Sequence, residues 1–230
     1  MLFKGTKKDK EAANAMLLSA DSEAEVLRAL KLGADIEAKN EREKTALMVA
    51  TECCDGDLVV VLSKLGADLN TSDMRGNTAL MYAVVAVERL FEIRRIFLEA
   101  DGVDLDATNK DGCTALMWAA WNGQLDSVSM LLDKGADINL RDLKGTTALM
   151  YATSLGYSDI VRVLLERGAD TKINNNDGKT ALELTDNPDV LAEFDRHSER
   201  INTKHEQNSA LEKKEQINQI IEDLEKDLKE

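Results

Sequence analysis

The stretch GTTALMYATSLGYSDIVRVLLERGADTK, residues 145–172, decides the fold because the chain repeats nearly the same text several times. Its two anchors are a Thr-Ala-Leu opening and a Gly-Ala-Asp-like close. The openings lie at Thr45, Thr78, Thr114, Thr147 and Thr180, and the closes lie at Gly33, Gly66, Gly102, Gly135 and Gly168. Both series have spacings of 33, 36, 33 and 33 residues. Two independent markers that share one period and one interruption indicate a tandem repeat protein.

Each unit is predicted to be a helix, a turn, a second helix and a hairpin-like loop, as the unit from Thr114 to Gly135 illustrates. Thr114 precedes an apolar-periodic run and is expected to cap a short helix. An Asn-Gly pair ends that helix, and a second helix follows over residues 125–134 until Gly135 adopts a left-handed conformation. The next loop runs extended and reverses at residues 142–145. The inward-facing positions are expected to be Leu116, Ala119 and Ala120, then Val128, Leu131 and Leu132.

The hairpin segments DMRGNT (residues 73–78) and DLKGTT (residues 142–147) add a D-x-x-G-x-T motif to this pattern. In its 33-residue period, its helix openings and closes and this motif, the chain resembles the ankyrin repeat family over about residues 7–196. The resemblance implies an all-α fold, an ankyrin-repeat solenoid of stacked helix–turn–helix units with hairpin-like loops. The sequence adds a C-terminal helix to it.

Two departures from the family pattern lead to further expectations. The usual Thr-Pro-Leu-His is Thr-Ala-Leu-Met in four units, so we expect the units to pack through methionine side chains. These methionines are Met48, Met81, Met117 and Met150. The first hairpin, KNEREKT, has Glu43 where the family usually has glycine, and we expect a distorted turn there.

The repeat domain is predicted to cover residues 7–196 and to be followed by a helical tail over residues 197–230. Its units are expected at about residues 7–40, 41–73, 74–109, 110–142, 143–175 and 176–196. The first unit has a degenerate first helix and a clear second one over residues 22–32, and the sixth has an opening without a close. Both end units are interpreted as polar caps.

The third unit spans 24 residues from Thr78 to Gly102, against 21 in the others. Val85-Ala86-Val87 replaces the break between its helices, and we expect the extra residues to add nearly one turn of helix. This insertion is interpreted as a length change tolerated in a loop, with a dedicated binding feature as the less favoured interpretation.

The tail lacks Gly and Pro after residue 196 and is rich in helix formers. Its apolar residues Ile217, Ile221, Leu224 and Leu228 follow a four-three-four spacing that extends over only about two heptads. We therefore expect a capping or protruding helix in a monomer, in preference to a coiled coil. Weak self-association through residues 211–228 stays open.

The amino-acid composition limits the classes of partner that can be expected. The chain has 29 basic and 43 acidic side chains and a formal net charge of −14. This disfavours nucleic acid and anionic membranes, because contacts with phosphates need Lys or Arg. It is compatible with a basic protein partner or simply with solubility. No apolar stretch approaches the roughly 18 residues of a membrane span, and the N-terminus lacks the apolar region of a signal peptide. Cys53, Cys54 and Cys113 lack metal-site spacing and are interpreted as reduced thiols of a cytoplasmic protein.

The repeats contain no pattern that indicates catalysis. The histidines, His197 and His205, both lie in the tail, so the repeats have none for a Ser-His or Cys-His pair or for a metal site. The chain also lacks the glycine-rich phosphate-binding motifs. We therefore predict a protein that is not an enzyme and has no catalytic residues, no cofactor and no metal.

A protein partner is predicted to bind the concave face, where the resemblance implies that hairpin tips and first helices line up. The predicted contacts at the tips are Arg42, Met74, Arg75, Asn77, Lys110, Asp111, Cys113, Leu143 and Lys144, and those on the helices are Glu52, Val85, Trp121, Asn122, Ser154 and Leu155. Trp121 is either an exposed contact residue or covers the next unit's first helix. Tyr82, Trp118 and Tyr151 are expected in the core.

Two other functions remain open from the sequence. One is a self-assembling structural protein, driven by the C-terminal helix. The other is the targeting arm of a larger protein whose catalytic part follows Glu230, because ankyrin arrays are often fused in this way, including in proteins that bacteria deliver into host cells.

Overall fold

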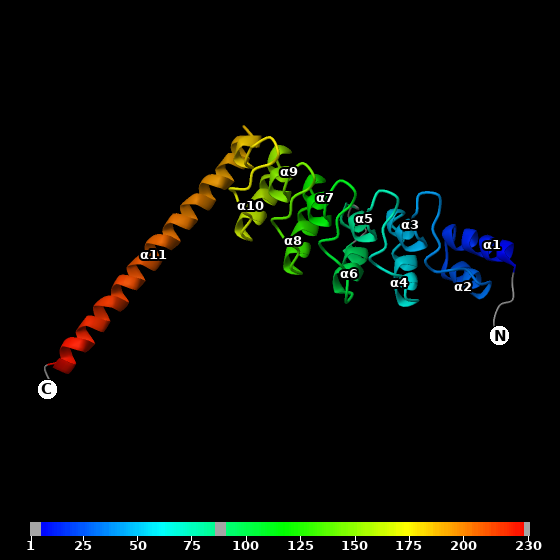
Figure 1. Ribbon diagram of the computed structural model, residues 1–230, viewed down its shortest axis with the longest axis horizontal. Helices are drawn as coiled ribbons and strands as arrows, with labels where there is room; N and C mark the ends of the chain where they lie inside the picture. Colours follow the sequence, from blue (N-terminus) through cyan, green and yellow to red (C-terminus); the bar gives the residue numbers. More distant parts are fainter. Residues whose placement is uncertain (1–5, 86–90, 228–230) are drawn as a thin grey trace.

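The computed structural model describes residues 6–85 and 91–227 and shows a row of helix pairs (Figure 1). The first helices of the pairs are α1 (Lys7–Leu18), α3 (Ala46–Glu52), α5 (Ala79–Val85), α7 (Ala115–Trp121) and α9 (Ala148–Ser154). The second helices are α2 (Glu23–Lys31), α4 (Gly56–Lys64), α6 (Phe91–Glu99), α8 (Leu125–Asp133) and α10 (Ser158–Glu166). Each pair packs against the next, so one hydrophobic core runs along the row. The predicted all-α repeat stack is confirmed.

The recurring threonine begins the first helix of the units as expected. Its hydroxyl oxygen accepts a hydrogen bond from the amide three residues later, at 3.3–3.4 Å, which satisfies one of the free N–H groups of the helix. The residue whose amide donates is the methionine of the Thr-Ala-Leu-Met motif. The side chains of these methionines, Met48, Met81, Met117 and Met150, are all buried in the core.

The hairpin that contains Glu43 is not distorted, which corrects the expectation from the sequence. Glu43 has a φ of 59°, in the same left-handed region as Gly76 (φ 78°) at the equivalent position of the next unit. The Glu43 amide donates to the Asn40 carbonyl at 2.8 Å, as the Gly76 amide donates to the Asp73 carbonyl at 2.8 Å. The turn is therefore regular, and its cost is a strained backbone conformation in a non-glycine residue.

The third unit is described up to Val85, the last described residue of α5, and again from Phe91, the first described residue of α6. Helix α5 has seven described residues and α6 has nine. The extra turn of helix predicted for this unit falls mainly on residues 86–90, which lie outside the described residues. Val85, at the end of α5, is half-buried and packs against the core.

The first unit begins with a complete helix, although a degenerate one was expected. Helix α1 has 12 residues and starts with a capping box. The Thr6 hydroxyl accepts from the Asp9 amide, and the Asp9 carboxylate accepts from the Thr6 amide at 2.7 Å. Ala13 and Leu17 on this helix are buried against the stack.

The C-terminal end differs from the regular units. The Thr-Ala-Leu opening at residue 180 leads only to a short 3-10 helix (Leu182–Leu184), and α11 (Pro188–Asp227) then continues without a break past residue 196. Arg200 of α11 forms an ion pair with Glu166 at 2.5 Å. Beyond this contact α11 projects away from the stack (Figure 1). The predicted C-terminal helix is confirmed, but the side chains of its predicted apolar seam, residues 217–228, lie outside the described ones.

Within residues 6–85 and 91–227, none of the helices has the length and apolar character that a membrane span requires.

Candidate functional site

The tips of successive hairpins are joined into one row by backbone hydrogen bonds. The Met74 amide donates to the Arg42 carbonyl at 3.0 Å, and the Lys110 amide donates to the Arg75 carbonyl at 2.9 Å. The same bond recurs from Leu143 to Asp111 and from Asn176 to Lys144. We call the surface made by these tips and the first helices α3, α5, α7 and α9 the hairpin face. Its spacing from unit to unit is fixed by the main chain.

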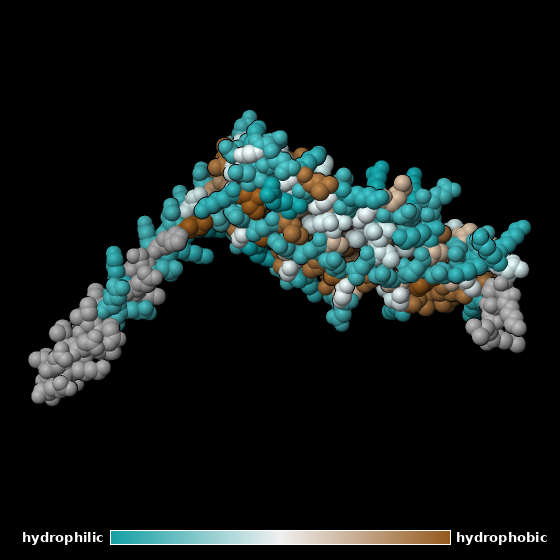
Figure 2. Space-filling model, in the orientation of Figure 1, coloured by the Kyte–Doolittle hydropathy of each residue, from teal (hydrophilic) through white to brown (hydrophobic). Residues whose placement is uncertain are grey.

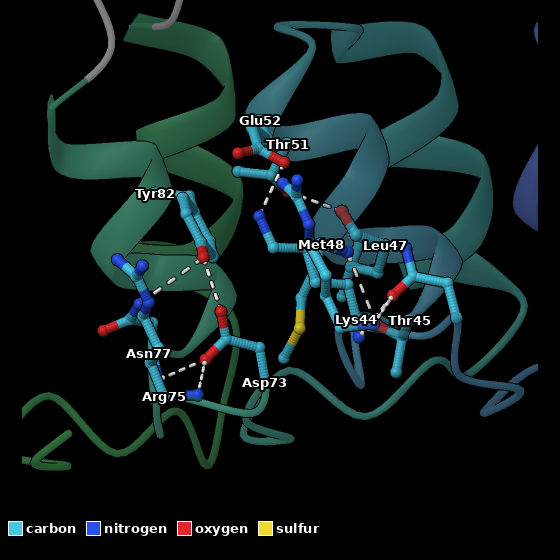
Figure 3. A network of polar contacts seen from close by, with 12 residues as sticks. Lys44, Thr45, Leu47, Met48, Thr51, Glu52, Asp73, Arg75, Asn77 and Tyr82 are labelled. Carbon is cyan, nitrogen blue, oxygen red and sulfur yellow. Dashed lines mark hydrogen bonds and ion pairs between the residues drawn. The ribbon is translucent and has the colours of Figure 1, made fainter. Parts of the chain in front are cut away.

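Each hairpin is closed by one Asp or Asn side chain. In the hairpin between the second and third units, Asp73 accepts from the amides of Arg75 and Asn77, both at 2.8 Å (Figure 3). The equivalent residues that make this pair of bonds in the other units are Asn40, Asn109, Asp142 and Asn175. Such side chains stabilise tight turns because they replace the missing backbone partners of the turn amides.

The choice between Asp and Asn follows the residue nine positions later, on the first helix. Asp73 and Asp142 are each followed by a tyrosine, whose hydroxyl donates to the second carboxylate oxygen at 2.6 Å from Tyr82 and 2.5 Å from Tyr151. The Asn residues at 40, 109 and 175 are followed instead by Val49, Trp118 and Leu184, which have no hydroxyl. The hairpin residue is therefore an aspartate in the two hairpins where a tyrosine hydroxyl can donate to its second carboxylate oxygen, and an asparagine in the others.

This bond is part of a polar network between the second and third units (Figure 3). Lys44 is buried; its Nζ lies 2.7 Å from Glu52 Oε2 and 4.3 Å from the centroid of the Tyr82 ring. Burial would lower the pKa of Lys44, but the ion pair with Glu52 and the contacts with Tyr82 outweigh it, so this pKa is raised. Burial and the bond to Asp73 both raise the pKa of Tyr82. Near pH 7, Lys44 is therefore protonated and positively charged, and the Tyr82 hydroxyl is protonated and neutral.

Two hollows lie next to each other on the hairpin face and share Trp118. The first, of about 350 Å³, is lined by Arg42, Lys44, Glu52, Asp73, Met74, Arg75, Asn77, Tyr82 and Trp118. The second, of about 340 Å³, is lined by Asn109, Asp111, Cys113, Trp118, Trp121 and Asn122. Both therefore have aromatic and polar walls, and residues predicted as partner contacts line each of them.

Trp121 packs on the next unit's first helix and is also exposed. Its ring stacks on Tyr151 of the next unit, with centroids 5.0 Å apart and an interplanar angle of 25°. The side chain is nevertheless 52% exposed. Trp121 thus covers the neighbouring helix with one face of its ring and leaves a large apolar surface in contact with water.

Most of the predicted contact residues are exposed on the hairpin face. The exposed ones are Arg42, Glu52, Met74, Arg75, Lys110, Asp111, Trp121, Asn122, Leu143, Lys144, Ser154 and Leu155. Val85 is half-buried. Tyr82, Trp118 and Tyr151, which were expected in the core, are half-buried. Trp118 and Tyr151 pack against the core, and Tyr82 and Trp118 line hollows of the hairpin face.

Asn77 and Cys113, which are also among the predicted contact residues, are buried. The Asn77 side chain is buried and accepts a hydrogen bond from the Asn109 amide group at 2.9 Å. The Cys113 sulfur is buried 3.9 Å from the Tyr151 hydroxyl, and burial raises the pKa of its thiol. Both side chains pack against the next unit, which a pattern within one unit does not reveal.

The D-x-x-G-x-T motif contains Asp73 and Asp142, but these two carboxylates were not among the predicted site residues. The signal was present as the nine-residue spacing between Asp and Tyr in these units. Within the described residues there is no cluster of three or more His, Cys, Asp or Glu side chains that could hold a metal ion.

Comparisons with known proteins agree with this architecture. Family models for ankyrin repeats match residues 12–109 and 85–142 (three copies) and residues 131–184 (many copies). A search of curated proteins found no matching relative. Among solved structures, the ankyrin repeat domain of Bcl-3, described as a unique member of the IkappaB protein family, is similar to this chain with 29% identity and a TM-score of 0.67. The match covers 75% of this chain and 76% of that one. Ankyrin repeat domains are generally non-catalytic modules that bind other proteins, and this chain belongs to the ankyrin repeat family.

Proposed function

We propose that this protein is a non-catalytic recognition module, an adaptor or scaffold, that binds a protein partner through the hairpin face. The observation that carries the proposal is Trp121, which is stacked on Tyr151 on one side and 52% exposed on the other. A rigid, exposed tryptophan beside a hollow is the type of residue that dominates binding energy in protein interfaces. The stack also fixes the ring before binding, so little side-chain entropy is lost when a partner covers it.

Apolar side chains at the hairpin tips support the same surface. Met74 is 49% exposed and Leu143 is 71% exposed, at positions where turn chemistry alone favours polar residues. They lie in the third and fifth units, on either side of the unit that carries Trp121. A partner that covers all three would bury apolar area along the row of tips, and Arg75 and Lys144 next to them would provide polar contacts at the rim.

The test compares the wild-type protein with a variant carrying Trp121→Ala, Arg75→Glu and Lys144→Glu, by affinity capture from cytosolic lysate followed by a direct binding measurement with the captured protein. A control variant, Arg95→Glu on α6, changes one charge on a second helix. Thermal melts must agree among the three proteins. We expect the control to retain the partner and the triple variant to lose it. Equal retention by all three would refute the hairpin face as the site.

Self-assembly through α11 is a second candidate, because this helix continues far beyond its contact with α10 (Figure 1). Sedimentation of the protein with and without residues 201–230 tests it. A monomer that is unchanged by the deletion contradicts assembly, whereas an oligomer that is lost on deletion supports it. We further propose a reducing compartment such as the cytoplasm, since the neighbouring thiols of Cys53 and Cys54 are both free and exposed.

A further inference from the structure

A larger hollow lies on the opposite helices of the first two units, between α2 and α4. Its volume is about 640 Å³, and its lining residues are Asp21, Ser22, Glu23, Leu27, Asp55, Asp57, Leu58, Val60, Val61, Lys64 and Leu65. Figure 2 shows a hydrophobic area at this end of the stack, over α2 and α4. Leu27 and Leu65 are 36% and 41% exposed. We call this hollow the α2–α4 groove.

The apolar character of the groove is not a requirement of the repeat, because the fourth and fifth units have polar residues at the same places. The relevant positions lie six residues and one residue before the closing glycine of each unit. They are Leu27 and Leu32 in the first unit, Val60 and Leu65 in the second, Ile96 and Asp101 in the third, Ser129 and Lys134 in the fourth, and Arg162 and Arg167 in the fifth. The fold therefore tolerates polar residues here, and the leucines of the first units need another explanation.

An ion pair connects the second helices of the fourth and fifth units. Arg167, at the end of α10, forms an ion pair with Asp133 of α8 at 2.6 Å. The equivalents of these two residues in the first two units are Leu65 and Lys31, which form no such bridge. Among the described residues, no side-chain hydrogen bond or ion pair connects α2 with α4. The groove thus lacks the bridge that joins α8 and α10 at the equivalent position.

The rim of the groove is acidic. Asp21, Glu23, Asp55 and Asp57 lie at the N-terminal ends of α2 and α4, where carboxylates also complement the helix dipoles. Asp55 caps α4 by accepting from the Leu58 amide at 3.0 Å. Within the described part of the chain, none of the four forms an ion pair with a Lys or Arg side chain. Their charges remain available to a ligand of opposite sign.

We propose that the α2–α4 groove is a second docking site, which takes a basic amphipathic helix of a partner protein. The occupant places apolar side chains on Leu27, Val60 and Leu65, and its Lys or Arg side chains meet the carboxylates of the rim. Helices α2 and α4 have nine residues each, a length of about 13 Å, so the groove accommodates roughly two to three turns of a bound helix. This is the helix-in-groove mode of recognition.

The acidic rim also disfavours three other occupants of the groove: a second copy of this chain, the C-terminal helix of another copy, and an anionic lipid surface. A second copy of this chain in a two-fold contact would place the acidic rims against each other. The C-terminal helix of another copy is a poor ligand, since residues 211–230 carry more acidic than basic side chains. An anionic lipid surface would be repelled by the same four carboxylates.

The experiment uses the full chain and a designed peptide of about 18 residues, built from leucine and lysine with the leucines at helical spacing. Two control peptides have the same leucines with glutamate in place of lysine, or the same composition with the spacing scrambled. Binding is measured by fluorescence anisotropy at two salt concentrations. The groove variant carries Leu27→Ser, Val60→Ser and Leu65→Ser, which remove apolar surface without adding charge; the fourth unit has Ser129 at the position of Leu27 and Val60. A charge variant carries Glu23→Gln and Asp57→Asn, and Trp121→Ala serves as the control on the hairpin face.

We expect the amphipathic basic peptide to bind more tightly than either control peptide. The groove variant should bind it about tenfold more weakly or worse, because the buried apolar contacts are lost. The charge variant should bind it more weakly and with less salt dependence, and Trp121→Ala should bind it as the wild type does. Equal binding of the scrambled peptide, or equal binding by the groove variant, would overturn the proposal by showing general attraction to an acidic protein. Sedimentation that changes from dimer to monomer in the groove variant would also overturn it, since the occupant would then be a second copy. All these outcomes are independent of whether the hairpin face binds its own partner.

Discussion

The bond between Asp73 and Tyr82 gives a quantitative test of how the hairpins are coupled to the first helices. The Asp73 side chain is 5% exposed, one of its oxygens is occupied by the turn amides, and the other accepts from the Tyr82 hydroxyl at 2.6 Å. Tyr82→Phe removes this donor and leaves a buried carboxylate oxygen without it. The expected loss of unfolding free energy is about 1–3 kcal/mol, the usual cost of an unsatisfied buried acceptor.

Asp73→Asn completes the cycle. An asparagine preserves the two turn bonds, as Asn109 does in the next unit, but loses the charge-assisted bond to the hydroxyl. The double variant has an asparagine in the hairpin and an aromatic ring without a hydroxyl nine residues later. Asn109 and Trp118 already form this combination in the natural sequence. The loss in the double variant should therefore be smaller than the sum of the single losses, by about 1–2 kcal/mol.

Urea unfolding at pH 7, followed by circular dichroism and analysed for all four proteins with a shared m-value, measures this coupling. Tyr151→Phe with Asp142→Asn forms a second, equivalent cycle, because Tyr151 donates to Asp142 at 2.5 Å. Additive losses in both cycles would refute the reasoning, since the Asp–Tyr pairing would then have no energetic basis and would be a coincidence of sequence.

Four further predictions concern other features of the structure. Burial would raise the pKa of Asp73, but hydrogen bonds from Tyr82 and the turn amides outweigh it and lower this pKa below its usual 3.8. The wild type should therefore be more stable than Asp73→Asn by the full amount above pH 3.8, and the difference between their urea midpoints should disappear as the pH falls below this value. Glu43→Gly and Cys54→Gly relieve positive φ values of 59° and 64° and should each raise stability by about 0.5–1 kcal/mol, and unchanged midpoints would contradict this. Gly112→Ala puts a Cβ 2.8 Å from the backbone nitrogen of the next hairpin tip at a φ of 79°, and should lower stability by about 2 kcal/mol or more in the same assay. Burial protects the Cys113 thiol, which should react with a thiol reagent more slowly than Cys54 in the native protein and equally fast in urea.

The features that the sequence predicted well are those with a cause inside one unit. A threonine can cap only the helix that follows it, and the glycine at the end of a second helix is required by its own backbone. Gly135, for example, has a φ of 92°, and a Cβ there would meet no atom within 4 Å. Such positions recur at fixed spacing, so reading one unit is sufficient to predict all of them.

The features that the sequence did not reveal depend on contacts between units. Cys113 is at a hairpin tip in its own unit, yet it is buried by Tyr151, which lies 38 residues later. Asn77 is buried through Asn109, 32 residues later. Tyr82 and Tyr151, which were expected in the core, stay partly exposed because each hydroxyl needs a polar partner, and that partner, Asp73 or Asp142, lies in the hairpin.

The repeated units provide their own internal comparison, and it separates structural from functional positions. The methionines of the Thr-Ala-Leu-Met motif are the same in four units and buried in each, so packing explains them. Trp121 has Glu52, Val85 and Ser154 as its equivalents, and Leu65 has Leu32 in the first unit but Asp101, Lys134 and Arg167 in the later ones. Neither side chain is needed to build its unit, and both are exposed. Because Trp121 lies on a first helix and Leu65 at the end of a second helix, these two departures mark different surfaces, and a partner bound at one leaves the residues of the other uncovered.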